Sequence, residues 1–125
     1  VPAEPTAAIS ITSPGCSNAV LHSGLVDVLR LSFHDAIPKD NHPSGTVVFS
    51  ATEAKQIVDF IRFHHAVSDP RHLLIHCEAG ISRSAAVAVF AASECGVPLS
   101  GQFAFLNTWV LSTLIEVAYP YYAAG

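Results

Sequence analysis

Nine consecutive residues, HCEAGISRS from His76 to Ser84, bring a thiol, a glycine and an arginine into one short segment. The segment follows the apolar run Leu73 to Ile75 and precedes the apolar sequence AAVAVFAAS, as expected of a loop between a strand and a helix. Such a loop can bind a phosphate, because its backbone N–H groups and the positive end of the helix dipole point at the same place. Cys77 adds a thiolate, the nucleophilic form of cysteine. The segment therefore predicts a loop that holds a phosphate and attacks its phosphorus atom.

The residue types in this loop suit an anion. Small side chains let successive N–H groups turn inward, and Gly80 can adopt the positive φ that other residues resist. The planar guanidinium of Arg83 can hold two phosphate oxygens at once. We expect phosphate, sulfate or vanadate to bind here, on residues Glu78, Ala79, Gly80, Ile81, Ser82 and Arg83.

Strands and helices are predicted to alternate along the 125 residues. Residues 8–11 and 26–33 alternate apolar and polar side chains as strands do, and residues 73–75 suit a parallel strand covered on both faces. Ser50 and Glu53 have the capping-box spacing, at the start of a helix that runs to about Val67. A buried helix is expected over residues 84–94, closed by Gly96, and a last helix over residues 111–118.

This order of elements predicts one α/β domain over residues 1–125, with a mainly parallel central sheet flanked by helices. Ligands of such sheets bind beyond the carboxyl ends of the strands. Cys77 follows the strand that ends near His76, so its loop lies where a ligand is expected. We place the loop between a central strand and a buried helix.

The sequence HCEAGISRS fits the signature H-C-x-x-G-x-x-R-[ST] at every fixed position, and so resembles the cysteine-dependent protein tyrosine phosphatases. The chain is most similar to their compact bacterial, dual-specificity-type members, over about residues 9–94 and more weakly near Asn107. The stretch after Asp35 is longer than in the family, and the region after Gly96 is shorter. The resemblance implies a phosphatase-type fold and hydrolysis of phosphate monoesters through a cysteinyl-phosphate intermediate, without metal or other cofactor.

The resemblance also implies a role for each matching residue. Cys77 would be the nucleophile, Arg83 would stabilise the transferring oxygens, and Ser84 would donate a hydrogen bond to the leaving thiolate. His76 would order the loop. The sequence LRLSFHD is similar to the family strand that leads to the general-acid aspartate, which assigns that role to Asp35. Asp40 is the alternative acid, because it would shorten the separation from Cys77.

Composition weighs against several other functions. The net charge is −4 and no cluster of lysine or arginine occurs, so no nucleic-acid partner is expected. The most apolar long segment contains Asn107, Glu116 and Pro120, which argues against a membrane span. The histidines lack the spacing of a zinc site, so no metal is expected. The three cysteines lack framework spacing, and the first residues lack the basic region and apolar core of a secretory signal, so we expect the cytoplasm.

The expected substrate is a phosphorylated protein, at phosphotyrosine or also at phosphoserine and phosphothreonine, or a small phosphate ester. Two rival functions are a weak pseudophosphatase that only binds phosphorylated partners and a rhodanese-type sulfurtransferase. The presence of Cys77, Arg83 and Ser84 together favours the active phosphatase. Plainer alternatives are a buried structural thiol at Cys77, a solvated carboxylate at Asp35 and a helix cap at Asn107. Cys16 and Cys95 are expected to be inert or to pair with Cys77.

Overall fold

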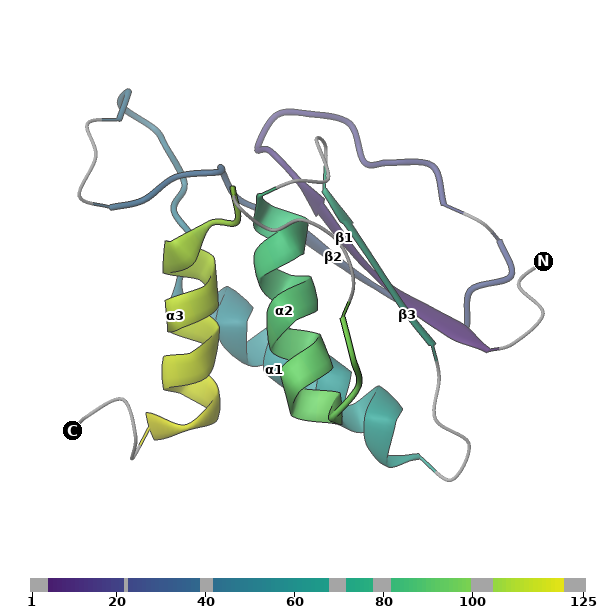
Figure 1. Cartoon of the computed structure of the whole chain (residues 1–125). Coiled ribbons are helices and arrows are strands. Elements are labelled where there is room, and N and C mark those ends of the chain that lie inside the picture. The colour runs from purple at the N-terminus through teal and green to yellow at the C-terminus, as the bar shows by residue number, and fades with distance from the viewer. Residues whose placement is uncertain are drawn as a thin grey trace.

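A parallel sheet forms one side of the molecule. The computed structural model describes residues 5–21, 23–38, 42–67, 72–77, 82–99 and 105–120. Within them, β1 (Thr6–Thr12) pairs with β2 (Asp27–Ser32) on one side and with β3 (His72–Cys77) on the other, in the order β2-β1-β3 (Figure 1). The register places Thr12 beside Ser32 and Ile11 beside Cys77. All three strands therefore end at the same edge, and the residues that follow them lie close together.

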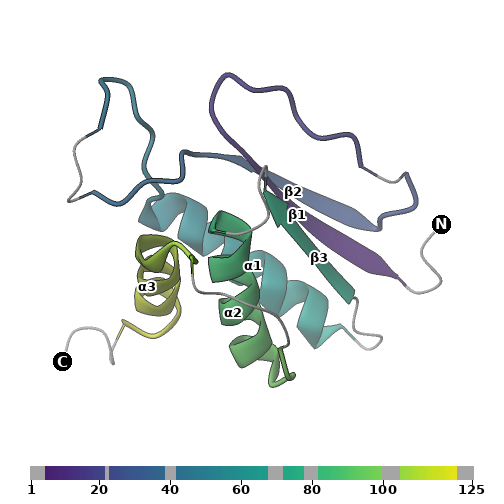
Figure 2. The same ribbon diagram turned by 45° about the horizontal axis from the view of Figure 1, so that its top comes forward.

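The central strand β1 is buried on both faces. Its alternating pattern predicted a strand, which is confirmed, but the polar residues Ser10 and Thr12 are also buried, at 1% and 6% exposure. Neighbouring strands cover its two edges. The described residues between β1 and β2 run on the side of the sheet away from the helices (Figures 1 and 2).

Three helices, α1 (Ala51–Ala66), α2 (Arg83–Cys95) and α3 (Thr108–Ala118), lie on the other side of the sheet (Figure 2). The predicted helices are thus confirmed, but those described cover only one face of the sheet. α2 packs beside β3, and α3 packs against α1 and α2. Their apolar faces and the sheet enclose a core of fully buried residues, which includes Ile9, Ile11, Phe33, Phe49, Ile57, Ile61, Val87 and Leu114.

The helix ends follow the sequence signals with one difference. α1 begins directly after Ser50, but the Ser50 hydroxyl donates to the carboxylate of Glu53 and makes no side-chain bond to the backbone. α2 ends at Gly96, whose φ of 67° is left-handed. The N–H groups of Gly96 and Val97 donate to the carbonyls of Ser93 and Ala92, the Schellman arrangement that a glycine favours.

β3 lies at the edge of the described sheet, so the prediction that the loop follows a central strand is wrong for this part of the chain. Its parallel direction is confirmed. Leu73 and Ile75 pack against the core, whereas Leu74 is 45% exposed, so the strand is not covered on both faces. Three apolar residues in a row fit a central strand and an edge strand equally well, because such a short run does not indicate which segments pair beside it.

A polar cluster joins α1, α2 and the end of α3. Arg62 Nε donates to Glu94 Oε1 at 2.6 Å, the Tyr119 hydroxyl donates to Glu94 Oε2, and the Arg62 guanidinium lies 5.6 Å from the centre of the Tyr119 ring. Partial burial acts to raise the pKa of Glu94. The hydrogen bonds from Tyr119 and Arg62 outweigh it, so the net pKa lies below its ordinary value.

None of the described helices is long and apolar enough to cross a bilayer.

Candidate active site

Cys77 is the last residue of β3 and is only 7% exposed. Its thiol donates to Ser84 Oγ at 3.2 Å, and the backbone N–H of Ser84 donates to Sγ at 3.4 Å. Ser84 belongs to the first turn of the 13-residue helix α2. The sulfur therefore lies at the positive end of a helix dipole, where a thiolate is favoured, and both groups of Ser84 can donate to it once the proton has left.

Arg83 joins the ends of the strands. It is the first residue of α2 and is 5% exposed. Its Nη1 donates to the carbonyl oxygen of Phe33 at 2.7 Å and to Ser13 Oγ at 3.1 Å. Ser13 follows β1 and Phe33 follows β2. These bonds hold a guanidinium charge at the carboxyl edge of the sheet, on the same side as Cys77.

Asp35 lies beside the start of α2, although it is 42 residues before Cys77 by the sequence numbering. Its Oδ1 accepts a hydrogen bond from Ser82 Oγ at 2.8 Å and another from Asn107 Nδ2 at 2.9 Å. The contact with Ser82 brings the carboxylate to the segment between Cys77 and α2. Asp40 lies outside the described residues, so the choice between the two aspartates as general acid stays a prediction.

Asn107 was expected as a helix cap, which is confirmed, and its side chain also contacts Asp35. Its Oδ1 accepts from the backbone N–H of Val110, which caps α3. Its Nδ2 donates to Asp35 and, at 3.1 Å, to the carbonyl of Ala36, while its own N–H donates to the carbonyl of Ser82. It is 3% exposed. The only signal in the sequence was the asparagine ahead of a helical segment.

Ser13 was not among the predicted site residues, and nothing in its sequence context indicated a contact with Arg83.

His76 is half-buried, and its Nε2 has no hydrogen-bond partner among the described residues. Together with Cys77 it borders a hollow of about 200 Å³, whose other described walls come from β1 and from Ser17 and Ala19. The predicted phosphate-binding residues Glu78, Ala79, Gly80 and Ile81 lie outside the described residues.

A second hollow, of about 380 Å³, adjoins Asp35. It is lined by polar and small residues of the long stretch after β2: His34, Asp35, Ala36, His42, Pro43, Ser44, Gly45 and Thr46. Two hydrogen bonds join the ends of this stretch. The His34 N–H donates to the Val47 carbonyl at 2.7 Å, and the Val47 N–H donates to His34 Nδ1 at 2.9 Å. The insertion noted in the sequence thus leaves space beside the proposed acid.

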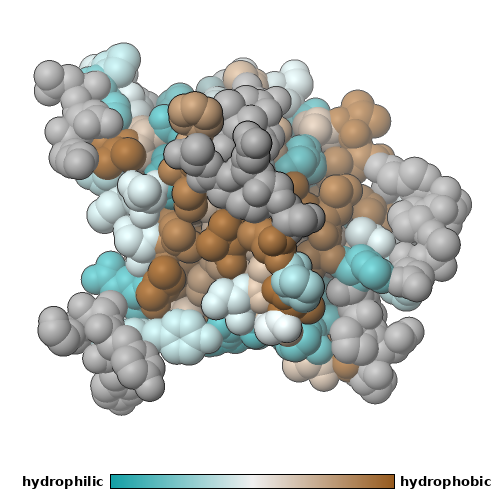
Figure 3. Space-filling model, in the orientation of Figure 1, coloured by the Kyte–Doolittle hydropathy of each residue, from teal (hydrophilic) through white to brown (hydrophobic). Residues whose placement is uncertain are grey.

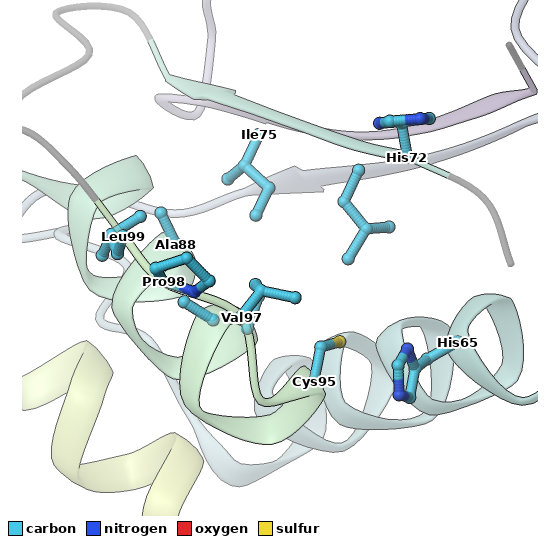
Figure 4. Close-up of a pocket in the computed structure, with 11 residues that line it drawn as sticks. His65, His72, Ile75, Ala88, Cys95, Val97, Pro98 and Leu99 are labelled. Carbon is cyan, nitrogen blue, oxygen red and sulfur yellow. The ribbon is translucent and has the colours of Figure 1, made fainter.

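Another hollow lies near the carboxyl end of α2, beside Cys95 (Figure 4). Its volume is about 390 Å³, and its described lining is apolar apart from His65, His72 and Cys95. Burial raises the pKa of the Cys95 thiol, and the charge of Glu94 adds to this. Apolar residues also gather on the surface over α2 and the adjoining edge of β3 (Figure 3). None of Cys77, Arg83, Ser84 and Asp35 lines this hollow, so it is no part of the candidate active site.

The described residues hold no cluster of three or more histidine, cysteine, aspartate or glutamate side chains that could bind a metal. The metal-free mechanism stays a prediction. Comparisons with models of protein families, with curated proteins and with solved structures gave no match. The features that indicate a function are therefore the motif and the contacts of Cys77, Arg83, Ser84 and Asp35.

Proposed function

We propose that this chain is a phosphatase of the protein tyrosine phosphatase type, which hydrolyses phosphate monoesters through a phosphate bound covalently to Cys77. The observation that carries the proposal is the position of the Cys77 sulfur, at the start of α2 and within hydrogen-bond reach of Ser84 Oγ and N. Arg83 supports it, because its guanidinium is held at the same edge of the sheet.

In the first step, the Cys77 thiolate attacks the phosphorus atom. The S–P bond forms while the ester P–O bond breaks, and Arg83 stabilises the charge on the transferring oxygens. The guanidinium has five N–H donors. Nη1 makes the bonds to Phe33 and Ser13, which orient the guanidinium at the carboxyl edge of the sheet. The departing oxygen takes a proton from Asp35.

In the second step, water attacks the phosphorus and the S–P bond breaks. The carboxylate of Asp35 takes a proton from the water, and the electron pair of the broken bond returns to the sulfur. Ser84 donates hydrogen bonds to the thiolate that forms. The products are inorganic phosphate and the free alcohol or phenol, and the enzyme returns to its starting state without metal or redox cofactor.

The proposed substrates are proteins phosphorylated on tyrosine and, secondarily, on serine or threonine. Glu78 adds a negative charge to the loop, which disfavours multiply charged headgroups such as polyphosphorylated inositol lipids. The proposed location is the cytoplasm, because the three cysteines lack the spacing of a disulfide framework.

The experiment that tests this function is hydrolysis of 4-nitrophenyl phosphate in the presence of EDTA. We expect turnover that vanadate inhibits and that Cys77→Ser abolishes, while the variant still binds vanadate. Binding of a phosphotyrosine peptide without turnover would favour the pseudophosphatase instead. Transfer of sulfur from thiosulfate to cyanide, with no ester hydrolysis, would favour the sulfurtransferase.

A further inference from the structure

We infer that the side chains of Ser82 and Asn107 form a clamp that positions Asp35 for proton transfer, an inference that rests on the proposed function. The clamp consists of the two hydrogen bonds to Asp35 Oδ1, from Ser82 Oγ at 2.8 Å and from Asn107 Nδ2 at 2.9 Å. Both residues act through Asp35 and are positioning residues.

The clamp is a closed ring of contacts. Ser82 and Asn107 both bond to Asp35, and they also bond to each other, since the Asn107 N–H donates to the Ser82 carbonyl at 3.1 Å. Asn107 Nδ2 further donates to the backbone of Ala36, next to the acid. The segment after β2, the segment before α2 and the start of α3 are thereby joined at one carboxylate.

Position matters here because Asp35 is exposed. An exposed carboxylate samples several rotamers, and a general acid needs one geometry within hydrogen-bond reach of the leaving oxygen. The two donors restrict the side chain to one orientation. They do so at the loop that holds the phosphate, because Ser82 directly precedes Arg83.

The clamp also decides which oxygen carries the proton. Oδ1 accepts both hydrogen bonds, and an oxygen that accepts from two donors is a poor place for the acidic hydrogen. In the protonated acid the hydrogen therefore belongs on Oδ2. A single oxygen is then available to donate to the substrate, and the same oxygen accepts a proton from water in the second step.

A purely structural role would not require these contacts. Asn107 caps α3 through Oδ1 alone, as a serine or aspartate could. Its Nδ2 instead reaches Asp35, with the whole residue 3% exposed. The amide group thus has two parts: Oδ1 caps the helix, and Nδ2 holds both Asp35 and the backbone of Ala36.

This separation permits a sharp experiment. Ser82→Ala removes one donor of the clamp, and Asn107→Ser removes the other while it keeps an oxygen that can cap α3. We would measure kcat and KM for 4-nitrophenyl phosphate, which has a good leaving group, and for phenyl phosphate, which has a poorer one. Each variant should lower kcat on phenyl phosphate roughly tenfold, the size expected for one lost hydrogen bond to a charged group. The effect on kcat for 4-nitrophenyl phosphate should be smaller, and KM for both substrates should stay unchanged.

The decisive control is the same pair of changes in an Asp35→Asn background. If the clamp acts through Asp35, each change there should alter kcat less than about twofold, because the effects of coupled residues are not additive. Ser82→Thr, which keeps the hydroxyl, should restore the wild-type ratio of the two substrates. The clamp would be refuted if kcat fell equally on both substrates, or if each change still lowered kcat roughly tenfold in the Asp35→Asn background. Neither result would contradict the proposed phosphatase function.

A readout without turnover keeps the two claims apart. In NMR spectra of the wild-type protein, the side-chain amide protons of Asn107 should exchange slowly with water, and Asp35→Ala should make them exchange faster. Equal exchange in the two proteins would show that the clamp is not formed, whatever the activity. A wild-type protein that neither turns over nor binds vanadate would refute the proposed function, and the role of the clamp with it.

Discussion

Replacing Ser84 by alanine should slow the second step of the reaction and spare the first. The Ser84 hydroxyl lies 3.2 Å from the Cys77 sulfur. In the first step this sulfur is an attacking thiolate, which a hydrogen bond stabilises in the ground state. In the second step the thiolate is the leaving group, so the same hydrogen bond stabilises charge that develops in the transition state.

The expected size follows from the geometry. A hydrogen bond to a charged group contributes about 1.5–3 kcal/mol, or roughly 10- to 100-fold in rate. The backbone N–H of Ser84 stays in place at 3.4 Å and continues to donate to the sulfur. We therefore expect a value near the lower end, about 10- to 30-fold.

Rapid quench with excess 4-nitrophenyl phosphate separates the two steps. Ser84→Ala should release one equivalent of nitrophenol per enzyme in a fast burst, followed by a slow steady state. Ser84→Thr keeps the hydroxyl and should show steady-state turnover close to the wild type. Two results would refute the role of Ser84 as donor to the leaving thiolate. One is a Ser84→Ala variant with no burst and an unchanged steady-state rate. The other is a variant whose burst is slowed as much as its steady-state rate.

Other predictions concern the acid, the helix cap and the pH dependence of folding. Asp35→Asn should lower kcat roughly 10²- to 10⁴-fold, most for poor leaving groups, whereas Asp40→Asn should change little. The reverse pattern would move the acid into the insertion. Asn107→Ala should lower the free energy of unfolding by about 1 kcal/mol more than Asn107→Ser, measured by urea denaturation, because only alanine removes the cap of α3. Equal stabilities of these two variants would contradict the capping role. The lowered pKa of Glu94 contributes stability that is present above its ordinary value of 4.5 and is lost as the pH falls through the folded value. Glu94→Gln should therefore weaken the fall in unfolding free energy between pH 5 and pH 2, and an unchanged fall would argue against the cluster with Arg62.

The local elements could be predicted from the sequence, because their signals are local. The left-handed turn at Gly96 and the start of α1 after Ser50 depend on residues close in the chain. The position of β3 at the edge of the sheet formed by the described residues could not be predicted, since it depends on which segments pair beside it.

The candidate site divides in the same way. Cys77, Arg83 and Ser84 lie in one motif, so their proximity follows from the chain itself. Two partners of Arg83 are a backbone carbonyl at Phe33 and a hydroxyl at Ser13, 50 and 70 residues away. No residue type marks such contacts in advance, because any residue has a carbonyl and serines are common.

The central claim is that the phosphoryl group is carried on Cys77. The most direct test is mass spectrometry of protein mixed with 4-nitrophenyl phosphate and quenched rapidly, with Ser84→Ala included because it should accumulate the intermediate. We predict the mass of one added phosphoryl group on the peptide that contains Cys77, and no such adduct in Cys77→Ser. The proposed mechanism would be contradicted by an active protein that carries the phosphoryl group on another residue. It would also be contradicted if neither the wild type nor Ser84→Ala formed an adduct while hydrolysing the ester.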